Sequence, residues 1–135
     1  MAVSLDQDIY RYIKQNKVTP TFLMPELEGR GTINTASATF GGGQFNLIGC
    51  RKIEAVAAAL ALGYDVIFSD VDIVIMRDPL KYLFFNGIDY VHSQNLHCGS
   101  KVKWRFEQKE RDGNTGFYAV KSNNVTIRTF DLTFR

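Results

Sequence analysis

Residues 63–79 read Gly-Tyr-Asp-Val-Ile-Phe-Ser-Asp-Val-Asp-Ile-Val-Ile-Met-Arg-Asp-Pro. The apolar run at 64–68 predicts a buried β-strand, and Asp70 and Asp72 follow at its carboxyl end, where open α/β sheets place their ligands. The apolar run at 73–76 predicts another strand after this acidic pair. Two carboxylates buried so close together are unfavourable unless a cation or hydrogen-bond donors compensate their charge. We therefore expect a divalent cation with a phosphate ligand, because Mg²⁺ and Mn²⁺ prefer carboxylate and phosphate oxygens.

The segments around this stretch predict an α/β sheet. Residues 45–62 carry apolar side chains at helical spacing, and Gly63 supplies the left-handed residue that ends a helix. Asp78 and Pro79 predict the N-cap and first position of a short helix that runs through Phe84. The remaining pattern predicts strands at 2–5, 21–24, 88–92 and 117–120, a first helix capped by Asp6, a loop at 26–43 and a last helix capped by Asn123.

Composition limits the class of protein. The 135 residues are 45% hydrophobic and 22% charged, which fits one globular domain over residues 1–135. The net charge of +2 is small and the charges are interspersed, so we expect no nucleic-acid partner. No apolar run approaches the ~20 residues that span a bilayer, so no membrane segment is expected within this chain. The triplet Asn124-Val125-Thr126 is a glycosylation acceptor, with meaning only if the chain enters the secretory pathway.

The residues alone leave other interpretations of the acidic pair open. A strand-end turn can be acidic without binding a ligand, and structural carboxylates also cluster at such positions. Asp70-Val71-Asp72-Ile73-Val74 also fits the D-x-D-x-[T/V] motif of haloacid-dehalogenase-like phosphohydrolases. In that class Asp70 would be the phosphorylated nucleophile and Asp72 a general acid or base. That motif normally lies on the first strand of its fold, whereas about half of this chain precedes it.

Three stretches together resemble a known family. They are residues 62–72, the Arg77-Asp78-Pro79-Leu80 segment that follows, and Asn114-Thr115-Gly116-Phe117-Tyr118 with Lys121-Ser122-Asn123 behind it. From about Ala2 to Phe130 the chain thereby resembles the nucleotide-diphospho-sugar transferases, which include plant and algal cell-wall arabinosyl- and xylosyltransferases. The resemblance implies a GT-A fold, which is a Rossmann-like α/β sheet that binds a nucleotide sugar between flanking helices. It also implies that this domain is incomplete at both ends.

The resemblance further implies a Mn²⁺ or Mg²⁺ ion on the acidic pair. Asp72 resembles the direct metal ligand of the family, and Asp70 would contact the donor ribose or reach the metal through water. The ion would neutralise the diphosphate leaving group as a Lewis acid.

The same resemblance implies further contacts to the donor. Asn114, Thr115 and Gly116 match a segment near the donor sugar, where a glycine allows close approach of the backbone. Lys52 matches a basic position that contacts phosphate, although a solvated lysine fits equally well. Asp6 follows the first predicted strand and would approach the nucleotide.

The resemblance therefore implies a glycosyltransferase of the Golgi lumen. It would move a sugar from a nucleotide-sugar donor, expected to be a UDP-sugar, to a glycan or glycoprotein acceptor. The alternatives are the phosphohydrolase and an inactive remnant that binds a nucleotide sugar, since a chain truncated at both ends is expected to transfer sugar poorly. No catalytic residue, donor sugar or acceptor is assigned from the sequence.

Overall fold

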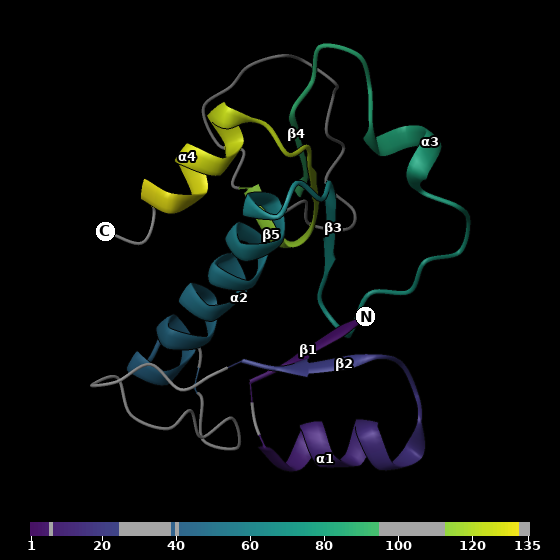
Figure 1. The fold of residues 1–135 in the computed structure, drawn as a ribbon, viewed down its shortest axis with the longest axis vertical. Coiled ribbons are helices and arrows are strands. Elements are labelled where there is room, and N and C mark those ends of the chain that lie inside the picture. Colours follow the sequence, from purple (N-terminus) through teal and green to yellow (C-terminus); the bar gives the residue numbers. More distant parts are fainter. Residues whose placement is uncertain (6, 25–38, 40, 95–112, 133–135) are drawn as a thin grey trace, which may run out of the picture. The chain divides into compact units, whose positions relative to one another are not determined.

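The computed structural model describes residues 1–5, 7–24, 39, 41–94 and 113–132. It combines helices with two small sheets (Figure 1). The chain divides into two compact units, Met1–Ala58 with Phe130–Arg135 and Ala59–Thr129. A single domain over residues 1–135 stays a prediction.

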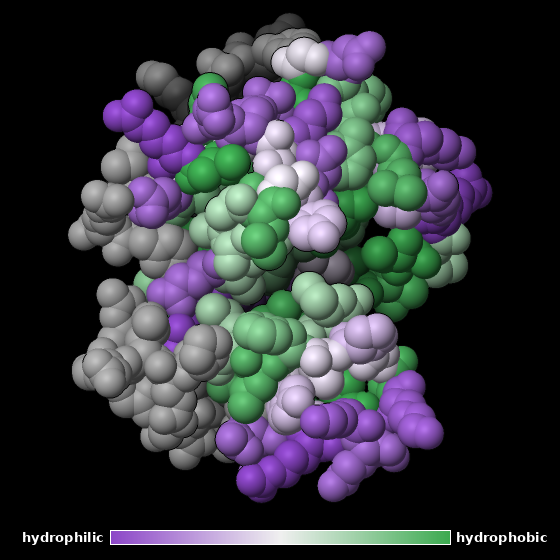
Figure 2. All heavy atoms as spheres, viewed as in Figure 1, coloured by the Kyte–Doolittle hydropathy of each residue, from purple (hydrophilic) through white to green (hydrophobic). Residues whose placement is uncertain are grey.

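The first unit contains a β-α-β element. Strand β1 (Ala2–Ser4) pairs in parallel with β2 (Thr21–Leu23), and helix α1 (Gln7–Asn16) connects them. Both strands and the helix were predicted, with strands slightly longer than those observed. None of the α1 residues is buried, and hydrophilic side chains gather over this helix in Figure 2. The predicted loop at 26–43 lies almost entirely outside the described residues.

Helix α2 (Gly43–Ala61) carries the alanine-rich sequence that predicted a helix at 45–62. It ends as expected, because Gly63 has a φ of +86° and its N–H donates to the Leu60 carbonyl oxygen across 2.9 Å. The N–H of Tyr64 donates to the Ala59 carbonyl oxygen across 3.1 Å, which completes a Schellman motif. Among the described residues, no helix combines the length and apolar character needed to cross a bilayer.

The second unit is built on a three-stranded antiparallel sheet. Strand β5 (Gly113–Val120) is central, with β3 (Val66–Ser69) on one side and β4 (Tyr90–Gln94) on the other. The central strand supplies the core, because residues 118–120 are at most 4% exposed. The acidic pair, predicted at the carboxyl end of a strand in an open α/β sheet, therefore follows a strand of an antiparallel sheet in the described residues. Strand β3 is half-buried rather than buried.

The predicted strand at 73–76 is wrong. The Ile73 N–H donates to the Asp70 carbonyl oxygen across 3.3 Å, and this turn takes the chain out of the sheet before the apolar run begins. All four residues of the run are exposed, with exposed fractions from 42% at Ile73 to 85% at Met76. In Figure 2 hydrophobic side chains are visible at the surface around this stretch.

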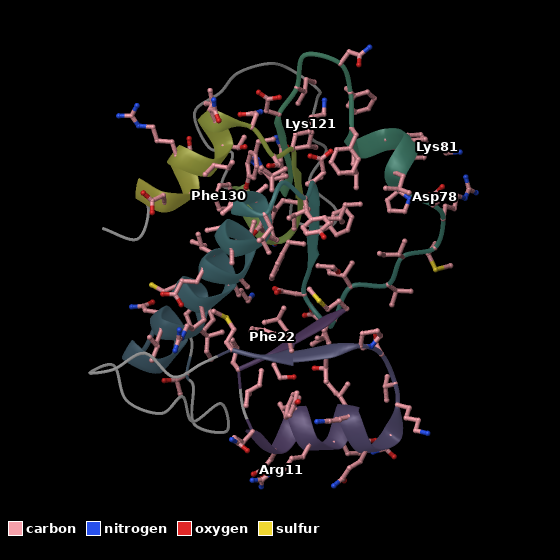
Figure 3. All side chains as sticks on the ribbon, in the orientation of Figure 1. Arg11, Phe22, Asp78, Lys81, Lys121 and Phe130 are labelled. Carbon is pink, nitrogen blue, oxygen red and sulfur yellow. The ribbon has the colours of Figure 1, made fainter. Side chains whose placement is uncertain are left out.

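A polar side chain accepts backbone hydrogen bonds at the start of each of the two remaining helices. Helix α3 (Leu80–Leu83) is shorter than predicted, and Pro79 is its N-cap rather than its first residue. The Asp78 carboxylate still satisfies this end, because its Oδ1 accepts a hydrogen bond from the Leu80 N–H at 3.0 Å; Figure 3 shows Asp78 beside α3. Helix α4 (Asn124–Leu132) follows Asn123, which caps it as predicted.

Candidate functional site

The acidic pair begins where β3 leaves the sheet. Asp70 directly follows β3, and its backbone N–H donates to the carbonyl oxygen of Gly116 on β5, with 2.7 Å between nitrogen and oxygen. The Ser69 hydroxyl donates to the Asp70 carbonyl oxygen across 3.0 Å. Asp70 is half-buried, and these two hydrogen bonds fix its backbone at the end of the strand.

Strand β5 carries a bulge at this end of the sheet. The register shifts between His92 and Ser93 of β4, so residues 115–117 lie opposite no residue of β4 in the described pairing. The Ser93 hydroxyl bridges the bulge, because it lies 3.3 Å from the carbonyl oxygen of Asn114 and 3.0 Å from that of Phe117. Bulges redirect side chains and are frequent next to active sites. The predicted strand at 117–120 missed this feature, since Asn114 to Gly116 lie within β5.

Gly116 has no room for a side chain. Its N–H donates to Asn114 Oδ1 across 2.7 Å, which forms a turn typical of asparagine. A Cβ at Gly116 would lie only 2.8 Å from this same oxygen and 3.1 Å from Asp70 Oδ2. The absence of a side chain at Gly116 therefore lets the Asp70 carboxylate and the Asn114 amide converge on one stretch of backbone.

Asp72 lies outside this packed cluster. It occupies the turn after Asp70 and its side chain is exposed, as is that of Thr115 in the bulge. The expectation that two buried carboxylates repel each other is therefore wrong for Asp72, because the turn puts this residue in solvent. Within the described residues, no three His, Cys, Asp or Glu side chains form a group that could hold a metal ion. Asp70 and Asp72 can supply only part of a coordination sphere.

An aromatic cluster lies on the sheet beside Asp70. The Tyr118 ring stacks on Phe68, with 5.0 Å between ring centroids, and the Tyr90 ring lies 5.7 Å from Tyr118 and 5.4 Å from His92. Burial raises the pKa of the Tyr118 hydroxyl well above its ordinary value, and Tyr90 and Asp70 raise it further. The sequence prediction missed the cluster, although Tyr90 and His92 are spaced to share one face of a strand.

A separate network joins the start of α4 to the end of α2. The Ser122 hydroxyl donates to the Leu60 carbonyl oxygen, and the Ser122 N–H donates to Asp65 Oδ1, both across 2.8 Å. The Lys121 ammonium donates to the carbonyl oxygen of Phe85, and Figure 3 shows Lys121 at the end of β5. Lys121 and Ser122 of the Lys-Ser-Asn motif thus make contacts that stabilise this part of the second unit. The role of Asp65 was missed, although its place two residues after a helix-ending glycine was a usable signal.

Two of the predicted donor contacts stay predictions. Asp6 lies outside the described residues. Lys52 is a half-buried residue of α2 in the first unit, whereas Asp70, Asn114 and Gly116 belong to the second. The structure therefore brings together Asp70, Asn114 and Gly116, with Asp72 and Thr115 exposed beside them in the sequence.

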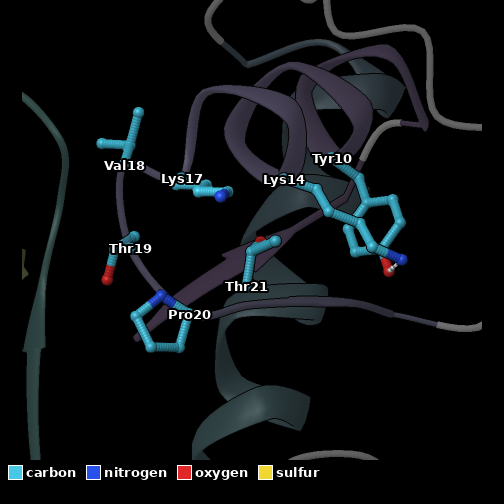
Figure 4. A pocket seen from close by; sticks show the side chains of 7 residues that line it. All are labelled: Tyr10, Lys14, Lys17, Val18, Thr19, Pro20 and Thr21. Atoms are coloured by element: carbon cyan, nitrogen blue, oxygen red, sulfur yellow. Dashed lines mark hydrogen bonds between the residues drawn. The ribbon is translucent and has the colours of Figure 1, made fainter.

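The first unit has a pocket of its own between α1 and β2 (Figure 4). Its volume is about 390 Å³, and Tyr10, Lys14, Lys17 and Thr21 contribute to its lining. The Lys14 ammonium donates to the Tyr10 hydroxyl across 3.3 Å. Both lysines lie at the C-terminal end of α1, where positive charge is favourable to the helix dipole. Of the predicted site residues that the structure describes, none lines this pocket.

Comparison with known proteins identifies the family of this chain. Residues 1–133 match the nucleotide-diphospho-sugar transferase family, and the chain belongs to that family. The match covers all three motif stretches that carried the resemblance. No solved structure matches the chain.

Three relatives are similar to parts of this chain. The beta-arabinofuranosyltransferase RAY1 of Arabidopsis thaliana is 28% identical over 132 residues, which are 97% of this chain and 23% of RAY1. A UDP-galactose:fucoside alpha-3-galactosyltransferase of Dictyostelium discoideum is 28% identical over 75% of this chain and 15% of its own length. An uncharacterized protein of Arabidopsis thaliana is 32% identical over 59% of this chain and 21% of its own length. The chain thus spans less than a quarter of each relative, and the names of the family and of two relatives point to glycosyltransferase activity.

Proposed function

We propose that this chain forms the donor-binding part of a glycosyltransferase with a GT-A fold. It would take a sugar from a nucleotide-diphosphate donor, UDP-linked, and pass it to a glycan or glycoprotein acceptor in the Golgi lumen. The observation that carries the proposal is the convergence of Asp70 and Asn114 on Gly116 at the bulged end of β5. Membership of the transferase family favours this function over a phosphohydrolase.

The residues at this strand end fit a hard divalent cation, Mn²⁺ or Mg²⁺. Asp72 offers an exposed carboxylate, and Asp70 offers a second carboxylate two residues earlier. Two carboxylates are sufficient, because Mg²⁺ is commonly bound by one or two of them together with water and substrate phosphates. Asp72 would hold the ion, whereas Asp70 would contact the donor ribose or reach the ion through water. When bound, the ion would neutralise charge on the diphosphate leaving group.

The bulge supplies the remaining contacts of the proposed donor site. Asn114 keeps the bulge closed through its hydrogen bond with the Gly116 N–H, and Gly116 leaves room for the Asp70 carboxylate, which would contact the donor. The exposed hydroxyl of Thr115 would hydrogen-bond to the donor sugar. Lys52 would contact the donor phosphates and Asp6 the nucleotide, as the family resemblance implies.

Calorimetric titration of UDP with and without Mn²⁺ tests the proposal. We expect UDP to bind only with Mn²⁺, and Asp72→Ala to weaken this binding by roughly tenfold or more, which corresponds to about 1.4 kcal/mol. Asp89→Ala is the matched control, because Asp89 is an exposed carboxylate of the same unit. Its binding should equal that of the wild type.

Two outcomes would contradict the proposal. Trapping of an aspartyl-phosphate at Asp70 would indicate the phosphohydrolase, in which this residue is the nucleophile. Absence of UDP binding under all conditions, in a chain with a cooperative thermal transition, would show that this chain does not form a donor site.

A further inference from the structure

The acceptor triplet Asn124-Val125-Thr126 is a motif that the proposed donor site does not use. It is the single Asn-x-Ser/Thr triplet of the sequence, and it forms the first three residues of α4. Its first residue must be accessible to accept a glycan, and its hydroxyl residue must be available to the enzyme that reads the triplet. In the folded chain the asparagine is accessible, whereas the threonine hydroxyl is not.

The two neighbouring asparagines at the start of α4 have different roles. Asn123 Oδ1 accepts hydrogen bonds from the N–H groups of Val125 and Thr126, at 2.9 and 3.0 Å, so Asn123 caps the helix. Asn124 is exposed, and its side chain makes no hydrogen bond to any residue that the structure describes. A sugar on Asn124 Nδ2 would therefore leave the cap intact.

The Thr126 hydroxyl takes part in the same cap in the folded protein. It is only 6% exposed, and its Oγ1 accepts from the Asn123 N–H at 3.1 Å while it donates to the Lys121 carbonyl oxygen. Together with Asn123 Oδ1 these bonds form a reciprocal arrangement like a capping box, with threonine at the third helical position. The hydroxyl that the acceptor triplet requires is therefore inaccessible once α4 has formed.

We propose that Asn124 is an N-glycosylation site that is modified on the nascent chain, before α4 folds. The inference rests on the luminal location that forms part of the proposed function. The co-substrate would be an oligosaccharide carried on a polyprenyl diphosphate. A bond forms between Asn124 Nδ2 and the anomeric carbon of the oligosaccharide, and the bond from that carbon to the diphosphate oxygen breaks. The polyprenyl diphosphate leaves, and the amide releases one proton to water.

A glycan on Asn124 would lie beside an exposed apolar side chain. Val125 is 70% exposed beside Asn124, and a bulky polar glycan on a surface residue is solubilising. Since the folded protein holds Thr126 in the cap, the order of events follows: modification first, helix formation second.

Translation of the full chain behind a cleavable secretion leader, in the presence of microsomes, tests the site. We expect the wild type to gain one mobility step that peptide N-glycosidase removes, and Asn124→Gln to gain none. Asn123→Gln is the matched control, because it alters the cap but keeps the triplet, and it should still be glycosylated. A wild-type chain that is protected from external protease yet carries no glycan would overturn the proposal, as would a glycan that persists in Asn124→Gln.

A second experiment tests the order of events. Folded, unglycosylated full chain is incubated with solubilised oligosaccharyltransferase beside Thr129→Pro, in which proline breaks the helix but leaves the triplet unchanged. We expect the proline variant to be modified at least several-fold faster than the wild type, and equal rates would show that α4 does not protect the triplet. UDP titration of the glycosylated wild type reports separately on the proposed donor site, so the two proposals can fail independently.

Discussion

The backbone N–H of Asp70 and the carbonyl oxygen of Gly116 are joined by a hydrogen bond of 2.7 Å between nitrogen and oxygen. This bond extends the pairing of β3 with β5 by one residue beyond Ser69. It brings the Asp70 carboxylate over the one residue of the bulge that has no side chain, where Oδ2 would lie 3.1 Å from a Cβ. The hydrogen bond and the glycine act together, because the first sets the position of Asp70 and the second makes room for it.

Gly116→Ala should therefore disturb the candidate site. The added methyl group would contact Asn114 Oδ1 at 2.8 Å, so the bulge must shift, at a cost of about 1–3 kcal/mol in the free energy of unfolding. Gly49→Ala is the control, since among the described residues no atom beyond its own stretch of α2 lies within 4 Å of a Cβ there, and alanine favours a helix by about 0.5–1 kcal/mol. Urea denaturation measures both changes. An equal change in the free energy of unfolding of the two variants would show that the added methyl group at Gly116 does not clash in solution.

The sequence predicted the elements around the site better than the site's own shape. Periodicity and capping residues located α2 and α4 because these signals depend on neighbouring residues only. The prediction at 73–76 failed for the opposite reason. Its apolar pattern matches a strand, but a turn at Asp70 leads the chain away, and the run pairs with no strand that the structure describes. Pairing is decided by residues distant in the sequence, which a local pattern does not contain.

The bulge shows the same limit at the scale of single residues. Asn114-Thr115-Gly116 was recognised as a motif, but its insertion into β5 depends on the register with β4 and on the hydroxyl of Ser93. The contact between Gly116 and the Asp70 carboxylate likewise joins residues 46 positions apart. Residue types therefore indicated which groups take part, whereas their convergence required the fold.

Gly63→Val should destabilise the protein through its backbone. Gly63 has a φ of +86°, a conformation in which a β-branched residue is strained by about 1–3 kcal/mol. Gly63→Asn should lose less stability, because asparagine adopts this region more readily. Thermal unfolding of the two variants distinguishes them. A valine variant as stable as the asparagine variant would mean that the end of α2 rearranges.

Tyr118 should make stability fall at alkaline pH. Its pKa is raised in the folded chain, first by burial and then by Tyr90 and Asp70. The unfolded chain releases this proton near pH 10, whereas the folded chain retains it, so the free energy of unfolding should fall by up to about 1.4 kcal/mol per pH unit above that value. Tyr118→Phe should flatten this dependence, and Tyr64→Phe, at a residue 65% exposed, should not. Urea denaturation from pH 8 to 11 checks whether the free energy of unfolding falls as the pH rises. If this free energy depends on pH in the same way in all three proteins, the prediction is wrong.

Ser122→Ala should weaken the junction between α2 and α4. Its hydroxyl donates to the carbonyl oxygen of Leu60, a residue with no exposed surface. Loss of a buried partner should lower the free energy of unfolding by about 1–3 kcal/mol. Ser69→Ala removes an exposed hydroxyl that donates to the neighbouring carbonyl oxygen and should have a smaller effect. Denaturant titration measures the free energy of unfolding of both variants. A larger loss of stability in Ser69→Ala than in Ser122→Ala would contradict the prediction.

Substitutions at Asp70 and Asp72 should affect stability and ligand binding differently. Asp72 is exposed in a turn, so Asp72→Asn should leave the free energy of unfolding within about 0.5 kcal/mol of the wild type. Its carboxylate is nevertheless the proposed ligand of the cation, so Mn²⁺-dependent UDP binding should fall by roughly tenfold or more, about 1.4 kcal/mol. Asp70→Ala should reduce both quantities, because the Asp70 carboxylate packs over Gly116.

Melting temperature and calorimetric affinity, measured on the same preparations, check this separation. Asp89→Asn serves as the control for a lost negative charge, since Asp89 is exposed on the same unit. If Asp72→Asn unfolds more easily but keeps its affinity for UDP and Mn²⁺, the residue is structural and the cation assignment is wrong. If Asp70→Ala loses only affinity, its packing against the bulge contributes nothing to folding. The expected pattern, a binding defect alone at Asp72 and a double defect at Asp70, follows from their different burial at the end of β3.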